Sequence, residues 1–180
     1  DEFDDDAKKT PFGRMNEPHH REDDATMVRT TTVEQMREEI PSRENPKKQT
    51  QSLVALAALA LRVKLDERFV AVVGAILDAL DRATTTLTTR GVDFDDDDIN
   101  DVNDKEEVVA AALAALSCVV GTVDGATKEM LKENNRGIGI VLKAIDAAMK
   151  EKKRTRVVNG LDCLAWTCRE KECARVAIFF

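Results

Sequence analysis

Helix-like segments of similar sequence recur along this chain, and this recurrence constrains the fold more than any other feature. When the chain is shifted by 48 residues, the apolar positions of 107–120 coincide with those of 155–168. The matched pairs are Val109 with Val157, Ala112 with Gly160, Leu113 with Leu161 and Leu116 with Leu164. A shift of 57 residues places Ala55, Leu56, Ala58 and Leu59 over Ala112, Leu113, Ala115 and Leu116. One such helix cannot bury its own apolar stripe, whereas stacked copies share a continuous core. The sequence therefore predicts an all-α fold of stacked helices.

Apolar residues at helical spacing indicate where the helices lie. We expect long helices over 52–65, 107–120 and 155–168, further helices over 69–83 and 138–149, and a short amphipathic turn over 128–133. Residues 173–180 begin one more stripe. The chain has six Phe, one Trp and no Tyr, and its Ala- and Leu-rich core favours closely packed helices over a sheet sandwich.

The first 50 residues differ in composition from the rest. They contain all four prolines and carry a net charge of −4, which predicts an extended, partly disordered acidic arm. One short helix is expected within it, with Val33, Met36 and Ile40 on one face before Pro41 ends it. An ordered arm that lies along the repeats or along a partner is the alternative. The repeats themselves are expected over 51–180.

The segment 84–104 interrupts the helical pattern. It combines the Thr-rich stretch 84–89 with the aspartate run 93–98, and we expect a solvated acidic insertion loop. The next helix is expected to start at Asp104, which Glu107 follows as in a capping box. The spacing of the acids does not match a calcium-binding EF-hand loop. A dock for a basic partner, or a site regulated by phosphorylation of the nearby threonines, remains as an alternative.

The order of the segments resembles the armadillo family of helical repeats. In that family a long helix is followed by a short helix, a glycine-marked turn and a medium helix. The residues 128–142, Lys-Glu-Met-Leu-Lys-Glu-Asn-Asn-Arg-Gly-Ile-Gly-Ile-Val-Leu, resemble the short helix and its glycine turn, and 172–180 resembles the start of another copy. The resemblance covers about 51–180 and implies a right-handed α-α superhelix. HEAT-type repeats or an irregular helical bundle would give much of the same pattern.

The resemblance also implies a concave protein-binding face lined by the long helices. Family members that bind nuclear-localisation peptides present Trp and Asn four residues apart, but the matching positions here are Ala57 and Leu61, Ala114 and Cys118, and Asp162 and Trp166. Because this ladder is missing, we do not expect recognition of basic import signals. The candidate protein-binding residues are therefore Ala114, Cys118, Asp162 and Trp166. Trp166 is the preferred anchor, and packing of its side chain in the core is the alternative.

No catalytic, cofactor or metal site is expected. Cys163, Cys168 and Cys173 are five residues apart, which places neighbours roughly 140° apart on a helix, so they are interpreted as small buried hydrophobes. Both histidines, His19 and His20, lie in the arm, so no Ser/His/Asp set forms. The basic run 150–156 is expected to be an exposed loop between helices, with contact to nucleic acid or to an acidic partner as the alternative.

These observations favour a non-catalytic scaffold or adaptor, expected to be a fragment or subunit of a larger assembly. The expected partners are other proteins, as a peptide or helix in the concave groove; neither nucleic acid nor a membrane is expected. A cytoplasmic location is expected from the unpaired cysteines, and a structural role in a cytoskeletal or ciliary complex remains open. A further alternative is autoinhibition, in which the acidic arm occupies the groove, since residues 108–180 carry a net charge of +4.

Overall fold

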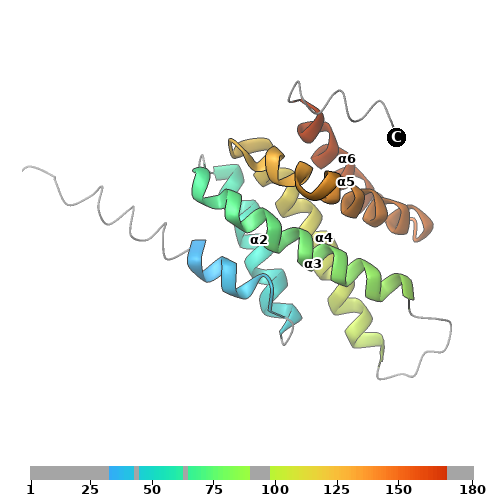
Figure 1. Cartoon of the computed structure of the whole chain (residues 1–180). Helices are drawn as coiled ribbons and strands as arrows, with labels where there is room; N and C mark the ends of the chain where they lie inside the picture. Colours follow the sequence, from blue (N-terminus) through green and yellow to red (C-terminus); the bar gives the residue numbers. More distant parts are fainter. Residues whose placement is uncertain (1–32, 43–44, 63–64, 90–97, 170–180) are drawn as a thin grey trace, which may run out of the picture.

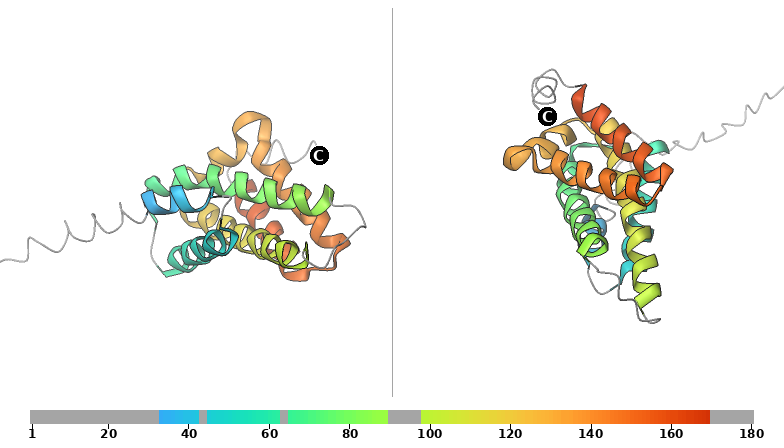
Figure 2. Two further views of the ribbon diagram at one scale, coloured as in Figure 1. Left: turned by 90° about the horizontal axis from the view of Figure 1, so that it is seen from below. Right: turned by 90° about the vertical axis from the view of Figure 1, so that its right-hand side faces the viewer.

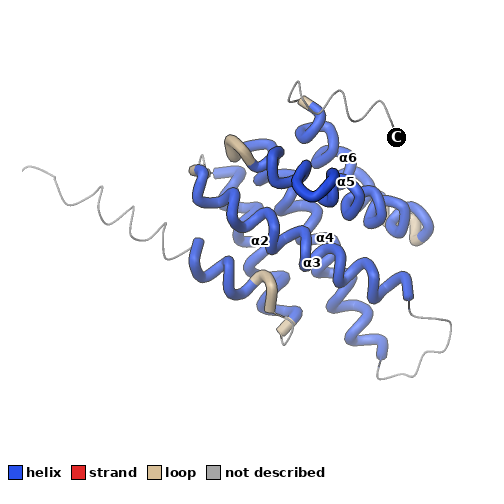
Figure 3. Tube along the Cα trace, viewed as in Figure 1, coloured by secondary structure: helices blue, strands red, loops and turns tan. Residues whose placement is uncertain are grey.

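The computed structural model describes residues 33–42, 45–62, 65–89 and 98–169 of this chain. Its elements in these ranges are helices, without strands, which confirms the expected all-α class (Figure 3). A short helix spans residues 33–39 and is followed by α2 (Pro46–Arg62), the 3-10 turn η1 (Glu67–Phe69), α3 (Val70–Thr89), α4 (Asp98–Thr122), α5 (Ala126–Lys150) and α6 (Arg154–Cys168). The stripe expected over 173–180 lies outside the described residues.

The helices form two layers. In one layer α4 lies between α2 and α6, and in the other α3 and α5 lie side by side and pack on the first (Figures 1 and 2). α4 and α6 run parallel, and so do α3 and α5. Glu106 near the start of α4 meets Arg156 near the start of α6, and Gly121 near the end of α4 meets Trp166 near the end of α6. Asp78 and Asp81 of α3 pair in the same order with Arg136 and Lys143 of α5.

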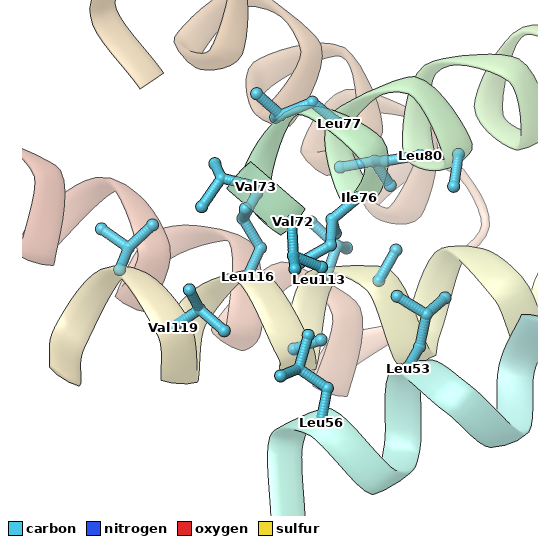
Figure 4. Close-up of a cluster of buried hydrophobic side chains, with 14 of the residues drawn as sticks. Leu53, Leu56, Val72, Val73, Ile76, Leu77, Leu80, Leu113, Leu116 and Val119 are labelled. Carbon is cyan, nitrogen blue, oxygen red and sulfur yellow. The ribbon is translucent and has the colours of Figure 1, made fainter. Parts of the chain in front are cut away.

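A single apolar core joins the two layers. Buried side chains from α2, α3 and α4 interdigitate in it, as Figure 4 shows for Leu53, Leu56, Val72, Val73, Ile76, Leu77, Leu80, Leu113, Leu116 and Val119. The contributing residues are aliphatic apart from Phe69, Met36, Met130 and Cys163. This agrees with the Ala- and Leu-rich composition that pointed to close helix packing.

Burial at repeat-equivalent positions depends on where the helix lies in its layer. Leu113 of α4 is 0% exposed, whereas the matched Leu161 of α6 is 53% exposed. Ala115 of α4 is likewise buried, whereas the matched Ala58 of α2 is exposed. Residues that match in sequence therefore differ in burial at these sites. The reason is that α4 has a neighbour in its layer on both sides, while among the described residues α2 and α6 have one on a single side.

Helical structure begins earlier than the arm boundary expected at residue 50. Val33, Met36 and Ile40 are buried in the common core, as expected for one face of a short helix. The loop after this helix is fixed to α2 and α3, because the side chain of Gln49 donates to the Ile40 carbonyl and Arg82 Nη2 donates to the Pro41 carbonyl at 3.2 Å. The arm from residue 33 onward is thus part of the packed fold, and residues 1–32 lie outside the described ranges.

The expected insertion loop at 84–104 is helical at both ends. α3 continues to Thr89, because Thr84 is buried and Leu87 packs against the core. The threonine hydroxyls donate to carbonyls one turn earlier: Thr86 to Arg82 at 2.9 Å, Thr88 to Thr84 at 3.0 Å and Thr89 to Thr85 at 2.9 Å. These bonds satisfy polar groups that otherwise disfavour a helix interior. α4 begins at Asp98 and not at Asp104. Residues 90–97 are outside the described part of the chain.

The expected division between a short and a longer helix is present within α5. Helical geometry breaks at Lys132–Asn135, where Glu133, Asn134 and Asn135 have φ of 52°, 59° and 66°. Asparagine tolerates this left-handed conformation better than most residues. The expected role of Gly137 in the turn is wrong, because it lies beyond the break. A Cβ atom there would lie 2.8 Å from the Met130 backbone, so Gly137 allows the two halves of α5 to approach closely.

Candidate protein-binding surface

The candidate residues come from two neighbouring parallel helices. Ala114 and Cys118 of α4 are partly exposed, and Asp162 and Trp166 of α6 are exposed. On α4 the spacing of four residues places Ala114 and Cys118 on one stripe, which Gly121 extends by one further turn. The contact of Gly121 with Trp166 brings the end of this stripe next to the predicted anchor. Gly121 therefore links the α4 stripe that contains Cys118 to Trp166 on α6. Gly121 was not among the candidate binding residues expected from the sequence.

Trp166 lies at the surface and not in the core. A Cβ atom on Gly121 would be 3.0 Å from Trp166 Cε2 and 3.1 Å from Nε1, so the indole packs tightly against this glycine and would have to shift for a larger residue. On the ring, the Arg169 guanidinium carbon is 4.5 Å from the centroid, at cation–π distance. The side chain remains 39% exposed between these two contacts. A large, partly held and partly exposed aromatic ring has the properties of an interface anchor.

α2, the other neighbour of α4, also carries exposed apolar side chains. Leu61 is 77% exposed and Val54 is 54% exposed, one on each side of the partly exposed Ala57. Leu61 is the position that matches Cys118 and Trp166 when the repeats are aligned. The sequence alignment contained this residue, but its exposure could not be known before the neighbours of α2 were known. We call the stripe Leu61, Ala114, Cys118, Asp162 and Trp166 the α2–α4–α6 face.

The cysteines are in environments that disfavour the reactive thiolate. Burial raises the pKa of Cys163 to about 12, despite an opposing hydrogen bond with Thr167, and burial also raises the pKa of Cys118. Cys118, Cys163 and Cys168 are free thiols, and Cys173 is outside the described residues. Within the described ranges, no three His, Cys, Asp or Glu side chains group as metal ligands. No helix described here is long and apolar enough to cross a bilayer.

Away from this face, a cleft of about 820 Å³ lies between the start of α2, the end of α3 and the start of α4. Its charged lining residues engage other protein groups: Arg82 holds the Pro41 carbonyl, Asp81 pairs with Lys143 at 3.3 Å and Lys105 pairs with Asp101 at 2.7 Å. The contacts of Arg82 and Asp81 tie α3 to its neighbours, and the Lys105–Asp101 pair lies within one face of α4, so the charges of this cleft serve the fold.

An ionic cluster joins the first part of α4 to the start of α6. Glu106 accepts from Arg156 at 2.8 Å and from Lys153 at 3.0 Å, and Arg156 also pairs with Glu151 at 3.1 Å. Burial raises the pKa of Glu106, but the hydrogen bonds and charges of its two basic partners outweigh that effect and leave this pKa below its usual value. The cluster therefore fixes the register of the two parallel helices.

Comparison with protein-family models, with curated proteins and with solved structures finds no match to this chain.

Proposed function

We propose that this chain is a non-catalytic scaffold of armadillo-like helical repeats that binds other proteins along the α2–α4–α6 face. The main support is the layer arrangement. The three long helices that match in sequence lie side by side and, where the contacts define direction, run parallel. Buried positions of the central helix match an exposed residue in one flanking helix and a buried residue in the other: Leu113 matches exposed Leu161 and buried Leu56, and Ala115 matches exposed Ala58 and buried Cys163. Stacked repeats have this relation between internal and terminal units.

The proposed ligand is a peptide or a helix from another protein. The face offers separated apolar positions, Leu61 and Trp166, with the small residues Ala114 and Cys118 between them. Asp162 supplies one exposed negative charge beside the tryptophan, one turn away on α6. Large apolar anchors around a stripe of small residues allow a partner backbone or helix to approach closely, and anchors of this kind dominate binding energy.

The proposal is tested by comparing Trp166→Ala with Leu142→Ala. Leu142 is 41% exposed but lies on α5, in the other layer, so the two substitutions remove similarly exposed apolar side chains from different faces. Full-length chains are used as bait in quantitative pull-downs, and captured proteins are then measured one by one with purified components. We expect Trp166→Ala to weaken binding about tenfold or more, as for an interface anchor, with Leu142→Ala near wild type.

Melting temperatures are measured in parallel, because Trp166 also contacts Gly121. If Trp166→Ala lowers the melting temperature strongly, the residue is a packing residue and not an anchor. If both variants bind every partner equally well, partner binding does not use this face.

A further inference from the structure

A second groove lies at the turn between α5 and α6. It has a volume of about 430 Å³ and is lined by Ala148, Met149, Lys152, Arg154 and Val157. Met149 is 63% exposed, so a large flexible apolar side chain is available to a ligand. The turn is the tan segment joining the two helices in Figure 3. Trp166 is twelve residues beyond Arg154, roughly 18 Å along α6, so this groove is separate from the α2–α4–α6 face.

The basic residues around this turn divide into two groups. Lys150 pairs with Asp146 at 2.7 Å, and Lys153 and Arg156 pair with Glu106. Lys152 and Arg154 have no ion-pair partner among the described residues, and both line the groove. The groove therefore combines an apolar surface with two cations whose charge is not neutralised within the described structure.

The backbone from which these two side chains project is fixed. Lys152 has a left-handed φ of 59°, and the turn is closed by bonds from Lys153 N to the Ala148 carbonyl at 2.8 Å and from Lys152 N to the Met149 carbonyl at 3.2 Å. The pairing of Lys153 with Glu106 fixes the turn to α4. A fixed turn lowers the entropy cost of presenting charges to a ligand.

We propose that this groove docks an acidic peptide segment that carries one large apolar side chain, the apolar group resting on Met149 and Val157 and carboxylates meeting Lys152 and Arg154. The volume suits one side chain and is at the small end of the range for cofactor pockets. Nucleic acid is disfavoured, because duplex and single-strand binding draw on several cations along a backbone and on aromatic stacking. Only two free cations and no aromatic residue line this groove.

The probe is a fluorescent peptide with the sequence of residues 1–6, Asp-Glu-Phe-Asp-Asp-Asp, which has the required chemistry. Fluorescence anisotropy with the full chain measures its affinity at low and at physiological salt. We expect saturable binding that weakens with salt, and weaker binding of a peptide with Ala in place of Phe. The double substitution Lys152→Glu and Arg154→Glu should weaken binding about tenfold. This is the combined effect expected when two exposed attractive ion pairs with the peptide are replaced by repulsive ones.

The matched control is Lys47→Glu with Lys128→Glu, which changes the net charge equally at exposed lysines outside the groove. Its affinity should stay within about twofold of wild type. Tighter peptide binding by a Phe3→Ala chain would identify the chain's own first residues as the segment and would also support the groove. Equal loss in both charge variants, no saturable binding, or tighter binding of a short oligothymidylate would overturn the proposal.

Discussion

Replacement of Ile40 by alanine tests whether the end of the acidic arm belongs to the fold. Ile40 is 0% exposed and joins the common core, although it lies before the first long helix. Its carbonyl accepts from Gln49, and its amide donates to Met36 at 3.0 Å. If this segment folds with the rest of the chain, removing its buried side chain should destabilise the entire domain.

The expected magnitude follows from complete burial. Truncation of a fully buried isoleucine costs about 2–5 kcal/mol, because transfer free energy is lost and a cavity remains. In a domain of this size each kcal/mol lowers the melting temperature by about 2–4 °C. For a cost of about 3 kcal/mol, Ile40→Ala should melt roughly 6–12 °C lower than wild type. The control Leu61→Ala, at a side chain that is 77% exposed, should change stability by about 0.5 kcal/mol or less.

The assay is urea unfolding followed by helical circular dichroism, together with thermal melting. Truncation gives an independent check. Deleting residues 1–32 leaves every described contact in place, whereas deleting 1–40 also removes the buried side chains of Val33, Met36 and Ile40. The longer deletion should therefore be far less stable than the shorter one. If Ile40→Ala matches Leu61→Ala, or if the two truncations unfold alike, the segment is not part of the cooperative unit.

Two further predictions concern helix contacts. The side chains of Ser52, Gln35 and Lys48 lower the pKa of Glu39 to about 2, so its carboxylate stabilises the fold at neutral pH and this contribution is lost as the pH falls from its ordinary pKa towards 2. Ser52→Ala should raise the Glu39 pKa, measured by carbon NMR titration of the carboxyl group; an unchanged pKa would contradict the assigned cause. A Cβ atom at Gly160 would lie 2.5 Å from Ile145 Cγ1, so Gly160→Ala should cost about 1–3 kcal/mol from overpacking, less about 1 kcal/mol of helix propensity. In an Ile145→Ala background this cost should vanish, and additive effects in urea unfolding would refute the contact.

Local helix formation was largely predictable from the sequence, because apolar periodicity is a property of consecutive residues. α6 was expected over 155–168 and spans Arg154–Cys168, and the short and longer parts of α5 were both expected. The errors fell where local signals were overridden. Thr84–Thr89 has low helix propensity, but Thr84 is buried and Leu87 packs against the core, so tertiary packing keeps the segment helical. The break in α5 occurs at Lys132–Asn135 and not at the glycines. Gly137 instead allows the close approach of the Met130 backbone.

The candidate surface was less predictable, because exposure depends on neighbours that are distant in sequence. The alignment of the repeats identified Ala114, Cys118, Asp162 and Trp166, and the structure places Trp166 at the surface, beside a glycine 45 positions earlier. The basic run 150–156 was visible in the sequence. Glu106 pairs with Lys153 and Arg156 and so leaves the other cations of this run without it as a partner. Glu106 lies on α4, far from this turn in sequence, so its role could not be predicted from the local pattern.

The sequence alone determined the all-α class, most helix positions and the similarity among the long helices, since these follow from side-chain spacing along a single helix. The tertiary structure decided which members of each similar set are buried. Leu113 and Leu161 have the same local pattern, but α4 is covered on both sides in its layer, and α6 on one side among the described residues. Burial is a property of the neighbours that a residue acquires, and those neighbours become known only when the helices are packed.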